Sequence, residues 1–226
     1  MIARDRLRFE TAPAPLPAAP LRTDVACVVG LCAVRASVEG SSPAALPEPL
    51  RQAFRRAGLT ADGRRPARAG APAGERFVDV PVPVESFAEF DRFFAWDERP
   101  VAATSTRAWT WLGAAVRAFF EEGGRRAHIV AVRPPPPLGT AVEDDERAAL
   151  LAAILPPDGE LPDAAARGTW RGVGNLFRVP EAALLVVPDL PELTTAARAA
   201  VPPPAAPPVV QPRFGPCDEP ASAPAD

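Results

Sequence analysis

The sequence lacks several residue types on which common active sites depend. All 25 basic residues are arginine, because lysine is absent, and this removes a Schiff-base lysine and the lysine of a phosphate-binding P-loop. One histidine and three cysteines give no cluster with the spacing of a zinc site, so we expect neither a metal nor a cofactor. Cys27 and Cys32 lie five positions apart in an expected strand, which points them to opposite faces. Together with Cys217 they form no disulfide framework and are expected to stay reduced.

Long apolar runs and an excess of charge are also missing. No run approaches the ~20 residues that span a membrane, and Met1–Glu10 carries charges without the apolar segment of a signal peptide. The formal net charge of −3 provides no field that would recruit nucleic acid or an anionic membrane. We therefore expect a protein that folds and assembles in the cytoplasm, with no membrane span and no nucleic-acid partner.

Proline, in contrast, is abundant and unevenly placed. The 31 prolines concentrate in the segments 12–20, 43–49, 134–137 and 201–220. This distribution predicts three parts. They are an extended N-terminal arm (1–23), an α/β domain (24–194) with a disordered or loop insertion at about 37–76, and a proline-rich disordered tail (195–226).

Apolar strand patterns recur between these ends. Val25–Val34 and Ala182–Val187 are continuously apolar, which predicts strands buried on both faces of a sheet. Ala127–Val132 predicts another strand, and Phe77–Val84 predicts an edge strand or strand end because it contains two prolines.

Amphipathic helix patterns alternate with these strands. Ser86 and Glu89 form a capping box at the start of one helix. A second, apolar from Trp109 to Phe120, ends at Gly123 and Gly124 with a left-handed cap, and a third covers about 143–155. The insertion holds one short helix around 50–57. Strands alternating with helices predict an α/β fold, a layered sheet with helices packed on it.

Two groups of titratable residues are candidates for catalysis or metal binding. His128 lies in a buried strand without a nucleophile beside it, which favours a core or strand-end histidine. Asp144, Asp145 and Glu146 could bind magnesium or act as acid and base, but their place at a helix start favours capping.

Two further motifs resemble parts of nucleotide-binding or catalytic sites. The stretch 171–175 ("RGVGN") is a fragment of a glycine-rich phosphate loop without the full spacing, and a flexible connection is the favoured interpretation. Asp189 follows a strand, where α/β enzymes place catalytic acids, but Pro188 and Pro191 favour a turn.

An arginine-rich stretch lies within the insertion. It has one aromatic residue, Phe54, and no recognition motif, so a solvated insertion or a contact with a neighbouring subunit is favoured over nucleic-acid binding. Its arginines are Arg51, Arg55, Arg56, Arg64, Arg65 and Arg68.

Three blocks of sequence follow "DVACVVGLCAV" (24–34) in a characteristic order. They are "VPVPVESFAEFDRFFAWD" (80–97), "WLGAAVRAFFEEGGRRAHIVAV" (111–132) and "ALLVVPDLPEL" (183–193). Together they resemble the N-terminal portion of tail-sheath proteins from contractile phage tails and extracellular contractile injection systems. The matching positions are Ser86, Glu89, Phe90, Ala115, Val116, Arg117, Phe119, Phe120, Gly123, Gly124, Arg126, 128–132 and 188–192.

The resemblance implies a structural role without catalytic, cofactor-binding or metal-binding residues. Such subunits stack as rings around a tube, join baseplate components, and are linked by extended arms that add strands to each other's sheets. The partners implied are therefore copies of the chain itself, the tail tube and the baseplate. Two alternatives stay open: a small α/β enzyme or nucleotide-binding domain using Asp189 and the glycines near 172–174, and an adaptor that binds partners through its proline-rich ends.

Overall fold

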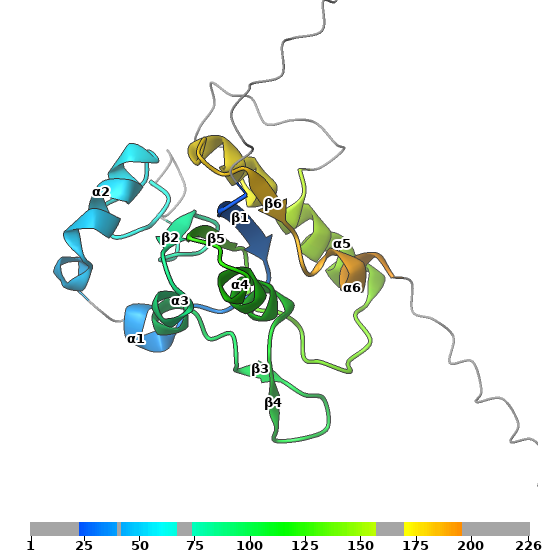
Figure 1. The fold of residues 1–226 in the computed structure, drawn as a ribbon. Helices are drawn as coiled ribbons and strands as arrows, with labels where there is room; N and C mark the ends of the chain where they lie inside the picture. Colours follow the sequence, from blue (N-terminus) through cyan, green and yellow to red (C-terminus); the bar gives the residue numbers. More distant parts are fainter. Residues whose placement is uncertain (1–22, 40–41, 67–73, 157–169, 196–226) are drawn as a thin grey trace, which may run out of the picture. The chain divides into compact units, whose positions relative to one another are not determined.

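The computed structural model describes residues 23–39, 42–66, 74–156 and 170–195, drawn in colour in Figure 1. Nearly all of the predicted arm and tail, and Cys217 and Arg68, lie outside the described residues. The strands are β1 (Val25–Gly30), β2 (Val82–Val84), β3 (Arg99–Pro100), β4 (Arg107–Ala108), β5 (Arg126–Ala131) and β6 (Leu184–Val186). The helices are α1 (Ala36–Glu39), α2 (Glu48–Arg56), α3 (Phe87–Phe93), α4 (Trp111–Glu121), α5 (Asp144–Ile154) and α6 (Leu190–Thr194), with 3₁₀ turns η1 (Pro43–Ala45) and η4 (Gly172–Arg178).

Four strands form one mixed sheet in the order β2-β5-β1-β6. β1 is parallel to both β5 and β6, and β2 is antiparallel to β5. All six residues of β1 are buried, so the strand predicted to be covered on both faces is the centre of the sheet. The predicted α/β class is confirmed by this sheet and its helices, although β1 ends at Gly30 rather than at Val34.

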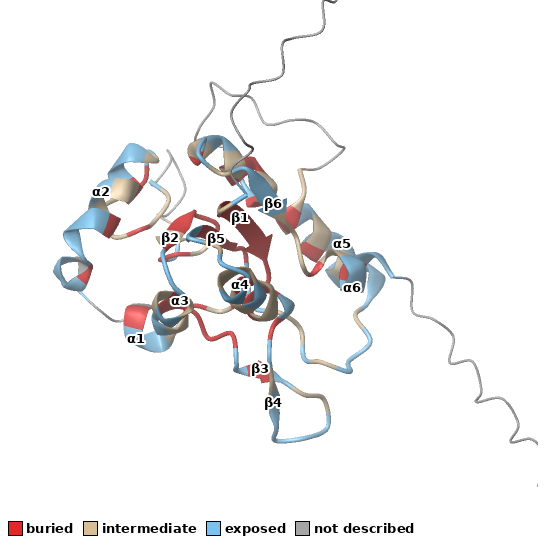
Figure 2. Ribbon diagram, viewed as in Figure 1, coloured by how far each residue is buried: buried red, intermediate tan, exposed pale blue. Residues whose placement is uncertain are grey.

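Alternate residues of β1 face two separate cores. Figure 2 shows β1 in red, because the whole strand is buried. Ala26 and Val28 belong to a core that includes residues of α2, α3 and α4. Cys27 and Val29 belong to a second core, which includes residues of α5 and α6 and the chain around η4. Cys27 and Cys32 fall in different cores, as their odd spacing predicts.

The described part of the insertion packs against the first core. Leu50 and Phe54, one helical turn apart on α2, are both buried. The ring of Phe54 lies 5.4 Å from that of Phe77 and is fully buried. The short helix predicted around 50–57 is thus present as α2, and two apolar side chains anchor it to the core.

Local capping signals predict the boundaries of α3 and α4. Ser86 accepts a hydrogen bond from the Glu89 N–H at 3.2 Å, while the Glu89 carboxylate accepts one from the Glu85 N–H at 2.8 Å. α4 ends in a Schellman arrangement, with Gly123 at a φ of 89° and the Gly124 N–H bonded to the Phe119 carbonyl at 2.9 Å. Both helix ends agree with the sequence prediction.

The last predicted strand differs from expectation. β6 covers only Leu184–Val186 and forms an edge of the sheet, so the prediction of a strand buried on both faces over Ala182–Val187 was wrong. Leu184 is 40% exposed and Leu185 is 42% exposed. An apolar run predicts that a strand is buried, but it does not identify the residues that cover the strand. Here the described residues cover Leu184 and Leu185 only in part.

Candidate functional site

Asp189 lies at the carboxyl ends of β1 and β6, the position where α/β enzymes place catalytic acids. It is 1% exposed, and its Oδ2 accepts a hydrogen bond from the Leu31 N–H at 2.8 Å. Burial raises its pKa to about 6, and its Oδ1 has no hydrogen-bond partner among the described residues. A Cβ on Gly30 would lie 2.2 Å from Oδ2, so glycine at the end of β1 leaves room for the carboxylate. The chain turns at 188–189, as the flanking prolines predict, and the hydrogen bond from Leu31 joins this turn to β1.

A second polar group fixes α6 beside α4. Arg99, which is buried, donates to both oxygens of Glu192 at 3.1 and 2.7 Å and to the Pro136 carbonyl at 2.9 Å. The Trp111 indole N–H also donates to Glu192. Because the Arg99–Glu192 pair is bidentate, it holds the orientation of Glu192 as well as its charge.

His128 is buried on β5, as predicted, and lines a groove between α2 and the residues that precede β6. Its Nε2 lies 3.1 Å from Glu181 Oε1, which is ion-pair distance, although neither ring nitrogen has a hydrogen-bond partner among the described residues. Burial lowers the His128 pKa, so the neutral imidazole is favoured. The groove, about 640 Å³, also exposes Arg56 and Glu85, and no serine, threonine or cysteine lines it among the described residues. It offers no nucleophile to the histidine.

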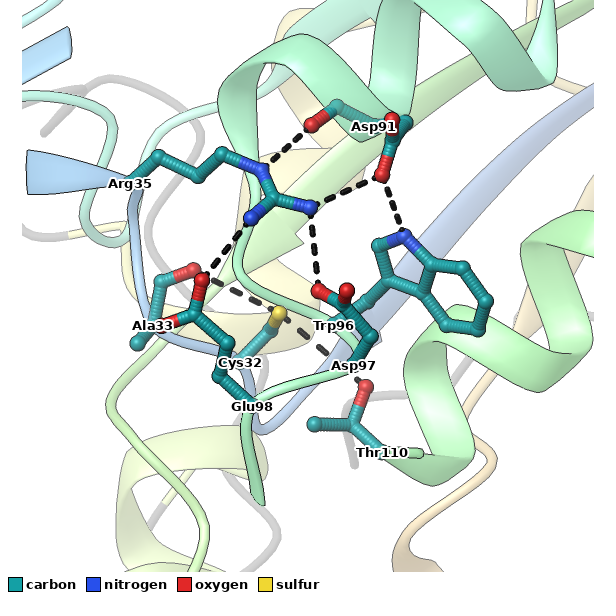
Figure 3. A network of polar contacts seen from close by, with 8 residues as sticks. All are labelled: Cys32, Ala33, Arg35, Asp91, Trp96, Asp97, Glu98 and Thr110. Atoms are coloured by element: carbon teal, nitrogen blue, oxygen red, sulfur yellow. Dashed lines mark hydrogen bonds and ion pairs between the residues drawn. The ribbon is translucent and has the colours of Figure 1, made fainter. Parts of the chain in front are cut away.

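Arg35 connects the chain after β1 to α3 and to the loop that follows it (Figure 3). Its guanidinium donates to the Asp91 carbonyl and carboxylate, to Asp97 and to Glu98 at 2.6 to 2.9 Å. The Trp96 indole N–H donates to the same Asp91 carboxylate at 2.7 Å, and this bond together with Arg35 lowers the Asp91 pKa. The network was not predicted, because Arg35 is more than fifty positions from its partners and shares no motif with them.

The two cysteines that the structure describes, Cys27 and Cys32, offer no reactive thiol. Burial raises the pKa of Cys27 and of Cys32 to about 12, and both are free. A thiol in that state is not a nucleophile near neutral pH. The Thr110 hydroxyl lies 4.0 Å from the Cys32 sulfur, beside the network of Figure 3.

The glycine-rich stretch 171–175 is ordered, so the predicted flexible connection was wrong. Gly172 donates its N–H to Asp79 at 2.7 Å, and the Asn175 side-chain amide donates to the same oxygen at 2.9 Å. Arg65 also pairs with Asp79. A Cβ on Gly172, whose φ is 50°, would lie 2.1 Å from the Ile154 carbonyl oxygen. These residues bind a carboxylate of the chain itself, so the stretch is built as a packed turn rather than as a phosphate loop.

The remaining charged candidates have structural partners. Asp144, Asp145 and Glu146 occupy the first turn of α5, as predicted, but the N-cap residue is Glu143 and no side chain caps the helix. Arg147 pairs with Asp144 at 2.9 Å. No group of three potential metal ligands occurs among the described residues. The arginines of the insertion pair mainly with nearby acids: Arg51 and Arg55 with Glu48, Arg64 with Asp62, and Arg65 with Asp79. Arg65 is largely buried, which the prediction of a solvated insertion missed.

The exposed apolar residues of β6 lie on an open sheet edge. Successive residues of β1 direct their backbone groups alternately toward β5 and toward β6. The Gly30 carbonyl accepts a hydrogen bond from the Val132 N–H, just after β5, and the Val25 carbonyl accepts one from the Ala183 N–H, just before β6. By this alternation Cys27 also faces β6, where its register partner is Leu185. In a regular parallel ladder Cys27 would bond to the two residues on either side of Leu185, and we infer that the N–H and C=O of Leu185 face away from β1. Within the described chain, no backbone hydrogen bond is made to Leu185 from the outer side.

The opposite edge of the sheet is closed. Val82 and Val84 pair with Ile129 and Ala127 on β5, so the intervening Pro83 faces outward, where it has no N–H to donate. α2 contacts β2 from beyond this edge. The two edges of the sheet therefore differ: β2 has at its outer side a proline without an N–H to donate, whereas no further described strand pairs with the outer side of β6.

Comparisons with family models, with curated proteins and with solved structures give no match to this chain. Among the residues that the structure describes, no helix is both long and apolar enough to cross a membrane. Among the described residues, the edge strand β6 carries two of the exposed large apolar side chains, Leu184 and Leu185.

Proposed function

We propose that the chain is a structural subunit that assembles with copies of itself, resembling a contractile tail sheath built around a tube. The observation that carries the proposal is the open edge of β6 with its two partly exposed leucines. Main-chain hydrogen bonds to an added strand supply affinity at such an edge, and apolar side chains on the two faces supply specificity.

The positions of the leucines support addition of a strand. Leu184 is in register with Ala26 and Leu185 with Cys27, so the two side chains lie on opposite faces of the sheet. An added strand would cover part of both at once. Completing their burial contributes about 1 kcal/mol each, in addition to new hydrogen bonds. A solvent-exposed edge of this composition is otherwise a risk of uncontrolled aggregation, which favours a specific occupant.

The order of sequence blocks supports the sheath-like form of this assembly. Three of the positions that carry the resemblance also build the fold. Ser86 begins α3, the Gly123–Gly124 cap forms the turn into β5, and Asp189 links β6 to β1. The sheath-like positions thus coincide with those that build the fold. The proposed partners are copies of the chain, a tail tube and baseplate components, and the proposed subunit is not an enzyme.

Proline substitution at β6 tests the proposal. Leu185→Pro removes the outward N–H and preserves the pairing with β1, so we expect a folded protein that no longer assembles. Leu185→Thr keeps the N–H and should still assemble, although more weakly. Sedimentation velocity and negative-stain electron microscopy of the full chain, alone and with its tube partner, provide the readout. Ordered assembly by Leu185→Pro equal to that of the native chain would overturn the proposal.

A matched variant on the same strand controls for folding. Leu184→Pro removes an N–H that faces β1, so we expect it to lower the melting temperature, unlike Leu185→Pro. If both proline variants have melting temperatures well below that of the native chain, their loss of assembly reflects unfolding. In that case a third variant, Leu185→Arg, tests the proposal, because it places a charge on the edge and keeps the backbone N–H. The proposal requires that this variant also assembles less than the native chain.

A further inference from the structure

The hairpin of β3 and β4 has one paired side and one open side. The two strands are antiparallel, with Pro100 in register with Arg107. On the outer side of β3, the Leu138 N–H donates to the Pro100 carbonyl at 2.8 Å. β3 is therefore paired on both sides. Within the described chain, β4 pairs with β3 alone.

The backbone of β4 directs hydrogen-bonding groups outward at Arg107. The Val101 N–H donates to the Thr106 carbonyl at 3.2 Å, so these two residues are bonded across the hairpin. Bonded and non-bonded pairs alternate along an antiparallel ladder, and Pro100 has no N–H to donate to Arg107. The N–H and C=O of Arg107 therefore face away from β3. No backbone group of the residues that the structure describes bonds to them from the outer side.

The side chains along β4 leave this edge accessible. Thr106 and Arg107 are exposed, and Ala108 is partly exposed. Trp109, which follows the strand directly, is 53% exposed, and its ring lies 5.0 Å from that of Trp96. The packing against Trp96 limits the movement of the Trp109 ring, so a partner that covers it loses little side-chain entropy.

The open edge of β4 matches the open edge of β6. Each has a residue whose backbone groups face outward, Arg107 on β4 and Leu185 on β6. Each also has exposed apolar surface beside those groups, from Trp109 at β4 and from Leu184 and Leu185 at β6. The other edge strands are not available in this way, because β2 carries an outward proline and β3 is paired on its outer side.

We propose that the outer edge of β4 adds to β6 of a second copy of the chain, so that the backbone of Arg107 bonds beside that of Leu185. This inference rests on the proposed function and names the strand that occupies the β6 edge. Backbone hydrogen bonds supply affinity, and Trp109 covers apolar surface that β6 leaves exposed.

Two proline variants of the full chain test the pairing. Arg107→Pro removes the outward N–H of β4, and Leu185→Pro removes that of β6. We expect each variant alone to self-associate about tenfold more weakly than the native chain, because it loses a hydrogen bond and the regular ladder around it. In an equimolar mixture, the intact β4 of one variant fits the intact β6 of the other, so one-to-one complexes form without longer assemblies. Sedimentation velocity measures both results.

Two further variants and one measurement separate pairing from folding. Arg107→Ala keeps the N–H and should retain most of the association that Arg107→Pro loses. Ala108→Pro removes an N–H on the side of β4 that pairs with Arg99, so it should lower the melting temperature more than Arg107→Pro does. If Arg107→Pro does not fold, hydrogen exchange of the native chain replaces it: the Arg107 amide should exchange quickly in the monomer and slowly in the assembly.

The outcomes distinguish this inference from the proposed function. If Arg107→Pro assembles like the native chain while Leu185→Pro does not, β6 receives a different segment and the inference is overturned alone. If Leu185→Pro assembles like the native chain, the proposed function itself is overturned. A mixture without one-to-one complexes, or an Arg107 amide that stays unprotected in the assembly, would also overturn the pairing of β4 with β6.

Discussion

At the scale of single residues, Asp189 shows how a buried carboxylate can serve structure at a cost in stability. The described chain supplies one N–H, from Leu31, to two carboxylate oxygens. Burial opposes ionisation more strongly than this hydrogen bond favours it, and the nearby Glu192 acts in the same direction as burial. Ionised Asp189 therefore weakens the fold, while its position joins two strands.

Stability should fall as Asp189 ionises. The pKa rises from 3.8 to about 6 on folding, so the contribution of Asp189 to the free energy of unfolding is largest below pH 4 and is lost as the pH rises through 6. The shift corresponds to about 3 kcal/mol. An asparagine side chain would keep an acceptor for the Leu31 N–H without a charge, so we expect Asp189→Asn to raise the stability at pH 8 and to remove this pH dependence. Urea unfolding between pH 4 and 8 measures both.

Asp91 provides a control of opposite sign. Its pKa is lowered by the Trp96 indole and by Arg35, so its contribution is present above its unfolded pKa and is lost as the pH falls. Asp91→Asn should therefore reduce stability at pH 8 and change it less at pH 4. Equal pH profiles for the two asparagine variants would contradict this account.

At the scale of elements, helix α2 turns a segment of loop-like composition into part of the core. Phe54 is fully buried and contacts Phe77, so we expect Phe54→Ala to lower the free energy of unfolding by about 3 to 5 kcal/mol. Arg56→Ala, on the exposed side of the same helix, should change it by less than about 0.5 kcal/mol. Guanidinium unfolding compares them. A small effect of Phe54→Ala would mean that the insertion is dispensable to the fold.

Elements with local signals could be predicted from the sequence, whereas those set by long-range contacts could not. Ser86 and the pair Gly123–Gly124 act on backbone groups a few residues away, so the caps of α3 and α4 follow from short motifs. The contact between Gly172 and Asp79 joins residues 93 positions apart, and the glycine-rich stretch alone resembled a flexible loop. The exposure of β6 depends on what lies beside it in space, which its apolar sequence does not contain.

The candidate surfaces followed the same division. The sequence correctly placed His128 in a buried strand, because the residues around it are apolar. It contained no sign that the backbone groups of Pro83 and Leu185 face outward, since both orientations depend on strand order and register. The tryptophans of the predicted helix read as part of its apolar stripe, but Trp109 precedes the helix and is half exposed.

At the scale of the whole molecule, stability should decrease from the centre of the sheet toward β6. β1 is buried along its full length and pairs on both sides, so amides at its centre should exchange with deuterium most slowly. The amide of Leu185 should exchange quickly in the isolated chain and become protected on assembly. Hydrogen exchange with mass spectrometry measures both states. Protection of Leu185 in the monomer would show that the edge is already covered.

Because the two sheet edges differ, they also determine how many neighbours each copy can bind and whether the two ends of a polymer are alike. If two β6 edges paired with each other, the open edge of each copy would be consumed and growth would stop at a dimer. Continued growth therefore requires a donor segment elsewhere in each chain, so that every copy gives one strand and receives one. Such a polymer has a free donor at one end and a free acceptor at the other. A short synthetic strand that occupies β6 would then act as a chain terminator at one end only.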